Sequence, residues 1–269
     1  MTRRTFVLGI ATASAAAATG CVTHPTPSNP ASLKVMAYNL HHGEGVDGRL
    51  DLERIAAVIR TANPDLVALQ EVDRHATRTG GIDQAAEYAR LTGLNVWYGG
   101  AMPFQGGEYG QALLSRWPLE DPRVLRLPGT AGREPRIAVS AFIQVPGLGR
   151  IRWAGVHLDA TREDGDRWEQ AGALLREWEQ DPTPTLLAGD FNATPESRVM
   201  RRLLDPGTRW EDTAGGFAAP TIPAEAPRSR IDFVLASPRG FWKTLQSEVI
   251  PEAVASDHRP LVVTLQKAS

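Results

Sequence analysis

The stretch LERIAAVIRTANPDLVALQE, residues 52–71, places a helix pattern directly before a strand pattern. Its first half carries apolar residues at the spacing of one helix face: Leu52, Ile55, Ala56 and Ile59. Asn63-Pro64 then ends the helix. The run from Leu66 to Gln70 is short and largely apolar, which indicates a strand that is buried on both faces. A helix that leads into such a strand is typical of an α/β domain.

The same alternation continues on both sides of this stretch. Further strands are predicted at residues 33–38, 111–115, 137–144, 150–158, 186–189, 231–236 and 260–265. Further helices are predicted at residues 82–91, 167–180 and 197–204. Residues 41–48 and 101–109 are interpreted as loops, whose glycines suit close approach to a ligand. The pattern predicts one mixed α/β (α+β) domain over residues 33–269, with two or more sheets and helices outside them.

Composition weighs against one class of function. The chain has 269 residues, of which 42% are hydrophobic and 22% are charged, as expected for a globular protein with a sizeable core. The formal net charge is -2, and a protein that binds nucleic acid mainly by phosphate neutralisation is usually basic. The charge therefore weighs against bulk binding of DNA or RNA.

The N-terminus differs from the rest of the chain. Arg3 and Arg4 precede an uncharged stretch that is too short to span a membrane comfortably, which indicates a twin-arginine export signal over residues 1–21. A buried N-terminal helix is the alternative. Cys21 is the only cysteine and follows Ala18-Thr19-Gly20, which resembles a lipoprotein cleavage box, although Ala18 stands where Leu is preferred. We expect lipidation at Cys21, a proline-rich tether over residues 22–32, and a periplasmic or otherwise extracytoplasmic, membrane-anchored protein.

Polar residues follow or interrupt the predicted strands. They are Asn39, Glu71, His157, Asp190, Asn192, Asp232 and the pair Asp257-His258. A carboxylate at a strand end is costly to desolvate without a partner, and Mg²⁺ or Mn²⁺ is a suitable partner for carboxylate and amide oxygens. Each residue alone also has a plain structural interpretation, as a cap, a turn residue or a core histidine.

Together these segments resemble the endonuclease/exonuclease/phosphatase, or DNase I-like, superfamily. The matching stretches are Tyr38-Asn39-Leu40, Leu69-Gln70-Glu71-Val72, residues 109–116, Gly155-Val156-His157-Leu158, Gly189-Asp190-Phe191-Asn192, Arg230-Ile231-Asp232-Phe233 and residues 256–260. They extend over nearly the whole chain from Leu33 to Leu265. The resemblance implies a four-layered α/β sandwich, in which two packed mixed β-sheets are flanked by helices.

The resemblance also implies roles for these residues. Asn39 and Glu71 would hold Mg²⁺ or Mn²⁺, with Asp257 close to that metal or to a second one. Asp190 would deprotonate the attacking water, and Asn192 would bind phosphate oxygens. His258, positioned by Asp232, and His157 would stabilise the transition state or assist the leaving group. Either Arg133 or Arg136 could face the phosphate; Arg136 is favoured because it adjoins a strand, and a surface charge is the alternative.

The predicted function is that of a monomeric, metal-dependent phosphoester hydrolase. The family includes nucleases, sphingomyelinases and inositol-polyphosphate phosphatases, and export and negative charge favour a lipid or small-molecule phosphoester over duplex DNA. A secreted nuclease is the first alternative, and an inactive protein that binds phosphorylated ligands is the second. His41 and His42 could contact phosphate or a metal, or could be solvated loop residues.

Overall fold

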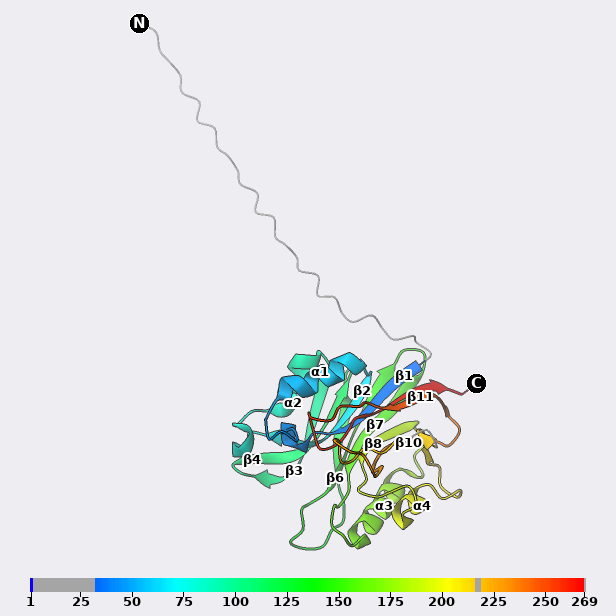
Figure 1. Cartoon of the computed structure of the whole chain (residues 1–269). Coiled ribbons are helices and arrows are strands. Elements are labelled where there is room, and N and C mark those ends of the chain that lie inside the picture. The colour runs from blue at the N-terminus through cyan, green and yellow to red at the C-terminus, as the bar shows by residue number, and fades with distance from the viewer. Residues whose placement is uncertain (2–31, 216–218, 269) are drawn as a thin grey trace.

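The computed structural model describes residue 1 and residues 32–215 and 219–268. Within these residues the chain forms two six-stranded sheets (Figure 1). In order, the first sheet contains β11 (Trp242–Val249), β12 (Leu261–Lys267), β1 (Ser32–Asn39), β2 (Leu66–Arg74), β4 (Gly107–Ser115) and β3 (Asn95–Phe104). The second contains β5 (Glu120–Arg126), β6 (Ile137–Val145), β7 (Gly149–His157), β8 (Thr185–Asp190), β10 (Asp232–Ser237) and β9 (Glu211–Asp212). Both are mixed, because β1–β2 and β7–β8 are parallel and the other pairs are antiparallel.

The two sheets pack face to face and share one apolar core. Its buried members come from both sheets, for example Val35 and Leu113 from the first and Val139, Trp153 and Val234 from the second. Burial of a side chain of this size stabilises the fold by about 1.5–3 kcal/mol. This core fixes the position of one sheet relative to the other.

Helices cover the outer face of each sheet. α1 (Leu52–Ala62) and α2 (Gln84–Thr92) pack on the first sheet, and α3 (Gly165–Trp178) and α4 (Arg198–Leu203) pack on the second, on the opposite side of the molecule (Figure 1). Three of these helices begin at a side chain that accepts a hydrogen bond from a backbone N–H of the first turn, the usual N-cap arrangement: Asp51, Asp83 and Ser197. The predicted four-layered sandwich is confirmed.

Each helix and strand expected from the sequence is present, with ends that shift by a few residues. Four strands were not predicted: β3, β5, β9 and β11. All four lie at the edge of a sheet, where side chains are partly exposed and the apolar pattern is weak. The predicted loop at residues 101–109 is wrong, because its two ends belong to β3 and β4, which form a hairpin.

The predicted export signal, the lipidation site Cys21 and most of the predicted tether lie outside the described residues. Ser32, the last residue of that tether, begins β1. In the part of the chain that the structure describes, no helix is long and apolar enough to cross a membrane.

Candidate active site

The pairing of the strands aligns three of the polar residues in the second sheet. His157 at the end of β7 lies opposite Asp190 at the end of β8, and Asp232 at the start of β10 lies opposite Asp190 on the other side. Gly189 allows β8 to approach β7 this closely, since a Cβ at that position would lie 2.0 Å from the backbone oxygen of Val156. The sheet itself therefore places an imidazole and two carboxylates side by side.

The first sheet contributes Asn39 and Glu71 from neighbouring parallel strands. Asn39 ends β1 and pairs with Gln70, so that Glu71 comes one residue further along β2. The register of β2 with β4 shifts between Leu69 and Val72, and Glu71 in this bulge has a left-handed φ of 58°. Bulges redirect side chains and are frequent beside active sites, and a left-handed conformation in a residue other than glycine is strained.

The segment before β12 brings in the last two residues. The Ser256 hydroxyl donates a hydrogen bond of 2.7 Å to the backbone oxygen of Asn39 and accepts one of 3.2 Å from the backbone N–H of His258. These two hydrogen bonds of Ser256 hold the segment before β12 against the end of β1. Asp257 and His258 are thereby held beside the ends of both sheets.

These residues line one open cavity of about 380 Å³. Its polar lining includes Asn39, Glu71, Arg136, His157, Asp190, Asn192, Asp257 and His258. Asp232 is fully buried behind His258. Arg133 is instead paired with Asp166 at 3.0 Å. Neither Arg133 nor the two histidines of η1 (His41–Gly43) is among the lining residues.

Asn39 connects the two sheets inside this cavity. Its amide nitrogen donates hydrogen bonds of 3.1 Å to Glu71 Oε1 and of 3.1 Å to Asp190 Oδ2. Its amide oxygen accepts a hydrogen bond of 3.1 Å from the backbone N–H of His41. In this arrangement the amide nitrogen faces both carboxylates, and Asn39 positions them relative to each other.

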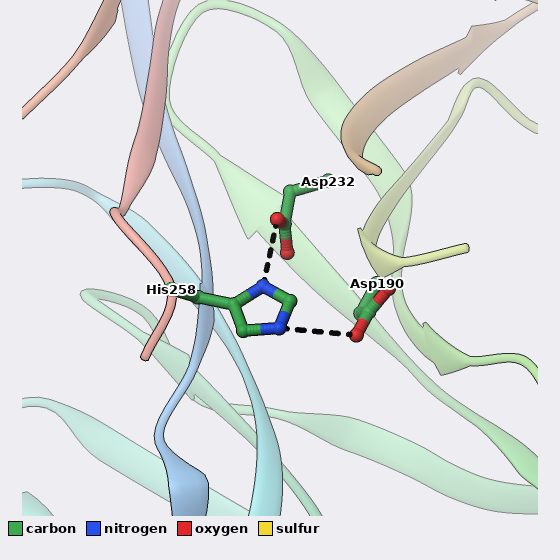
Figure 2. Close-up of side chains that lie close together, drawn as sticks. All are labelled: Asp190, Asp232 and His258. Atoms are coloured by element: carbon green, nitrogen blue, oxygen red, sulfur yellow. Dashed lines mark hydrogen bonds and ion pairs between the residues drawn. The ribbon is translucent and has the colours of Figure 1, made fainter. Parts of the chain in front are cut away.

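His258 lies between two carboxylates, as Figure 2 shows. Its Nδ1 donates a 2.9 Å hydrogen bond to Asp232 Oδ2, and its Nε2 lies 3.7 Å from Asp190 Oδ2. Burial opposes a charge on the imidazole, but the carboxylates of Asp232, Asp190 and Asp257, of which Asp232 acts most strongly, together outweigh burial and raise the pKa of His258 to about 10. His258 is therefore protonated at neutral pH.

Burial dominates the pKa of Asp190 and that of His157, unlike that of His258. Burial raises the pKa of Asp190 to about 7, although His258 and the hydrogen bonds from Asn192 and Asn39 oppose this. Burial, together with the charges of Arg136 and His258, lowers the pKa of His157 well below its usual value. A carboxylate that titrates near neutral pH can accept a proton, and a neutral imidazole beside it can exchange one.

Asn192 adjoins this group on the segment after β8. It adopts a left-handed φ of 48°, and its backbone N–H donates a 2.8 Å hydrogen bond to Asp190 Oδ1. Its amide nitrogen donates a 3.1 Å hydrogen bond to the backbone oxygen of Leu158, which holds the side chain against the end of β7. The strained turn thus brings Asn192 into the cavity lining beside Asp190.

The donors around Glu71 fit a divalent cation. Burial raises the pKa of Glu71, the Asn39 amide lowers it, and the nearby charge of Asp257 raises it again. Two carboxylates that repel each other at the rim of a cavity provide the hard oxygen ligands that Mg²⁺ and Mn²⁺ prefer. A second cluster, Asp190, Asp232 and His258, also has ligand atoms within 4.8 Å of one another. Glu71 and Asp257 both line the cavity and would hold the cation there, whereas Asp232 of the second cluster is fully buried outside the lining.

The sequence profile described as the Endonuclease/Exonuclease/phosphatase family matches residues 36–258, which include the whole of this site. The chain belongs to this family. Members of the family are hydrolases of phosphoester bonds and commonly use divalent metals. The predicted family membership is therefore confirmed.

Individual relatives agree with this assignment to the endonuclease/exonuclease/phosphatase family. A protein of Escherichia coli (strain K12) named Uncharacterized protein YbhP is 29% identical over 265 residues, which cover 88% of this chain and 97% of YbhP. The crystal structure of an endonuclease/exonuclease/phosphatase from Beutenbergia cavernae has a TM-score of 0.77 at 29% identity, over 88% of this chain and 72% of that chain. The structure of the mannosyl-6-phosphatase Bt3783 from Bacteroides thetaiotaomicron has a TM-score of 0.72 at 19% identity, over 87% of this chain and 99% of that chain, which shows a shared fold.

Two charged residues of the cavity were not predicted. Arg78 in η2 (Thr77–Thr79) donates two hydrogen bonds to the buried carboxylate of Asp73 and stacks 4.5 Å over the Phe104 ring. Glu134 contacts Arg136 Nη1 at 2.9 Å. Both lie on irregular segments, where a charged residue is usually solvated, so the sequence pattern gave little signal for them.

The same wall of the cavity is partly apolar. It includes Met102, Phe104, Tyr109 and Ile222. Tyr109 belongs to a segment that was expected to be able to line the site. Met102 and Phe104 also belong to residues 101–109, which were expected to approach a ligand, whereas the sequence pattern did not connect Ile222 with the site.

Proposed function

We propose that this protein is a divalent-metal-dependent hydrolase that cleaves phosphoesters by attack of a water molecule activated by Asp190. The observation that carries the proposal is the position of one buried carboxylate between two imidazoles. Asp190 Oδ2 lies 3.5 Å from His157 Nε2 and 3.7 Å from His258 Nε2, at the floor of an open cavity. This group contains a proton acceptor and a proton donor within reach of the same ligand.

Asp190 suits the role of general base. Its pKa of about 7 means that it is largely ionised just above neutral pH and still basic enough to accept a proton. The water oxygen attacks phosphorus, its proton passes to Asp190, and the P–O bond to the leaving group breaks. The leaving oxygen takes a proton from His258, which is charged and faces the same space.

Positive charge and hydrogen-bond donors surround the position of the phosphate. Arg136 and His258 carry charge into the cavity, and Asn192 offers an amide beside them. A divalent cation bound by Glu71 and Asp257 would add charge against the phosphate oxygens and the developing transition state. Asn39 holds Glu71 and Asp190 at a fixed separation, so we assign it a positioning role beside the metal ligands.

The experiment uses the domain from residue 22 onward, with bis-p-nitrophenyl phosphate and p-nitrophenyl phosphate as substrates. We expect hydrolysis with Mg²⁺ or Mn²⁺ and none with EDTA. Asp190→Asn should lower kcat by about 10³-fold, the size expected for loss of a general base. An unchanged rate in that variant, with the same melting temperature as the native protein, would reject the assignment.

We further propose that the enzyme works outside the cytoplasm, anchored through a lipid on Cys21. This rests on the sequence alone: paired Arg3 and Arg4, an uncharged stretch, and the only cysteine directly after it. The full chain expressed in a bacterial host should fractionate with membranes, and Cys21→Ser should release it. Recovery of both proteins in the cytoplasm would overturn this proposal.

A further inference from the structure

Two arginines line the cavity, and each is paired with a different kind of carboxylate. Arg78 is held by Asp73, which is fully buried and lies outside the cavity lining. Arg136 is held by Glu134, whose side chain is 36% exposed and is itself part of the lining. The charge of Arg78 is therefore balanced by a carboxylate that a ligand in the cavity does not contact. Arg136 differs, because the carboxylate paired with it also faces the ligand.

Arg136 retains hydrogen-bonding capacity while Glu134 is in place. Glu134 Oε1 lies 2.9 Å from Nη1 of the guanidinium. Nε of Arg136 is buried and has no hydrogen-bond partner among residues 32–215 and 219–268. A guanidinium has five N–H donors, so a phosphate can bind Arg136 without displacing the carboxylate. A phosphate bound there would lie close to the negative charge of Glu134.

That charge acts within the site and not only on Arg136. Burial, then the charge of Glu71 and then that of Glu134 raise the pKa of the Tyr109 hydroxyl, which lines the same cavity, while Arg136 lowers it. Glu134, Arg136, Tyr109 and His157 also surround a smaller hollow next to the main cavity. The carboxylate thus faces the space into which the phosphate must fit.

We propose that Glu134 is a specificity-determining residue that selects singly charged phosphodiesters over doubly charged phosphomonoesters. This rests on the proposed phosphoester hydrolase function. A monoester at pH 8 carries close to two negative charges, because its second pKa is about 6. A diester carries one. The second charge of the monoester adds repulsion from Glu134, so the charge at residue 134 disfavours the monoester relative to the diester.

The test compares two substrates that release the same p-nitrophenolate, at pH 8 with Mg²⁺ or Mn²⁺. Bis-p-nitrophenyl phosphate carries one negative charge and p-nitrophenyl phosphate carries close to two. For the native protein we expect a higher kcat/KM with the diester. Glu134→Gln keeps the shape of the side chain and removes its charge. It should shift the ratio of the two kcat/KM values toward the monoester by about tenfold, as expected for one unit charge acting across a partly screened site.

Three further variants make the test specific. Glu134→Asp keeps the charge and should keep the native ratio. Glu134→Lys should shift the ratio further than Glu134→Gln, so the ratio follows the charge at this position. Glu163→Gln is the matched control, since Glu163 is an exposed carboxylate that faces Arg133 at 3.8 Å and does not line the cavity. It should leave both rates and their ratio unchanged.

The outcomes separate this inference from the function on which it rests. Equal loss of activity on both substrates in Glu134→Gln would mean that Glu134 only positions Arg136, and would overturn the inference while hydrolysis stands. A ratio that does not change with the charge at residue 134 would overturn it as well. If the native protein hydrolyses neither substrate with either metal, the proposed function fails and the inference falls with it.

Discussion

Replacing Asp232 by Asn removes one negative charge from behind the active site and changes no residue that lines the cavity. Asp232 Oδ2 accepts the 2.9 Å hydrogen bond from His258 Nδ1, and its carboxylate is fully buried. The variant keeps the shape of the side chain, and an amide oxygen can still accept that hydrogen bond. The perturbation is therefore chiefly electrostatic, and His258 is the group that it acts on.

The size of the effect follows from the pKa of His258. Asp232, through its charge and its hydrogen bond, is the strongest of the three carboxylates, with Asp190 and Asp257, that raise this pKa from 6.5 to about 10 against the effect of burial. Without that charge we expect a value near or below 6.5, because burial disfavours the charged imidazole. At pH 8 only about one imidazole in thirty would then carry a proton, so kcat should fall about thirtyfold. The deficit should grow about tenfold for each further pH unit until the native protein itself loses the proton near pH 10.

The assay is the pH dependence of kcat between pH 5.5 and about 10.5, with an NMR titration of the imidazole of His258. In the native protein, the rate should rise through the pKa of Asp190 at about 7 and fall through that of His258 at about 10. In Asp232→Asn the upper limb should move to lower pH, because His258 loses its proton at lower pH. The optimum should become lower and narrower.

Asp212→Asn provides the matched control. Asp212 on β9 is paired with the buried Arg230 at 2.7 Å, beside β10, and lies outside the cavity lining. This variant should lose stability and keep the native pH profile. If Asp232→Asn retains the native upper limb near pH 10, or if its rate at pH 8 stays within threefold of the native rate, then Asp232 does not set the charge of His258.

Three further predictions concern the metal, the phosphate contact and the fold. Mg²⁺ at ten times its Kd should raise the melting temperature of the native protein by about 3–6 °C and leave that of Glu71→Gln almost unchanged. Equal rises of the two melting temperatures in thermal scans would mean that Glu71 does not bind the metal. Arg136→Ala should lower kcat/KM by about a hundredfold, whereas Arg133→Ala, outside the cavity lining, should stay within about threefold. Gly189→Ala should reduce the free energy of unfolding, measured in urea, by about 3 kcal/mol, because its Cβ would lie 2.0 Å from the Val156 oxygen. Gly165→Ala is the control, since a Cβ there has no atom within 4 Å. Equal stability of the two variants would contradict this geometry.

The fold could be predicted from sequence to the extent that its strands are buried. The central strands β1, β2, β7 and β8 are largely apolar runs, and each was found. The edge strand β5 contains Pro122 and is largely exposed, so neither apolar alternation nor a buried run marks it. The tip of the β3–β4 hairpin, residues 101–109, was interpreted as a loop because Gly106 and Gly107 interrupt its pattern.

The candidate site was predictable where its residues end or follow buried strands. Asn39, Glu71, His157 and Asp190 all have such positions, and the structure brings them together at one cavity. Their functional roles stay a prediction until they are tested. The orientation of the Asn39 amide could not be predicted, since it depends on the backbone N–H of His41.

Arg78 and Glu134, the two charged cavity residues that were not predicted, lie outside the predicted strands, where the apolar pattern does not indicate which way a side chain points. Arg78 is held by Asp73, a buried carboxylate on β2 that was itself a signal of a nearby cation. Glu134 stands between the two arginines that were considered as phosphate ligands, and nothing in its spacing distinguishes it from a solvated residue. Only the packing of two distant segments shows that both side chains face the same cavity.

The proposed general base and the carboxylate opposite it come from different sheets, Asp190 from β8 and Glu71 from β2. Their separation is therefore set by the shared apolar interior around Trp153, which lies fully buried between the two layers. A displacement of about 1 Å in such a geometry can cost about a hundredfold in rate. Substitutions deep in the interior can thus inactivate the enzyme while every residue of the cavity remains native and the chain remains folded.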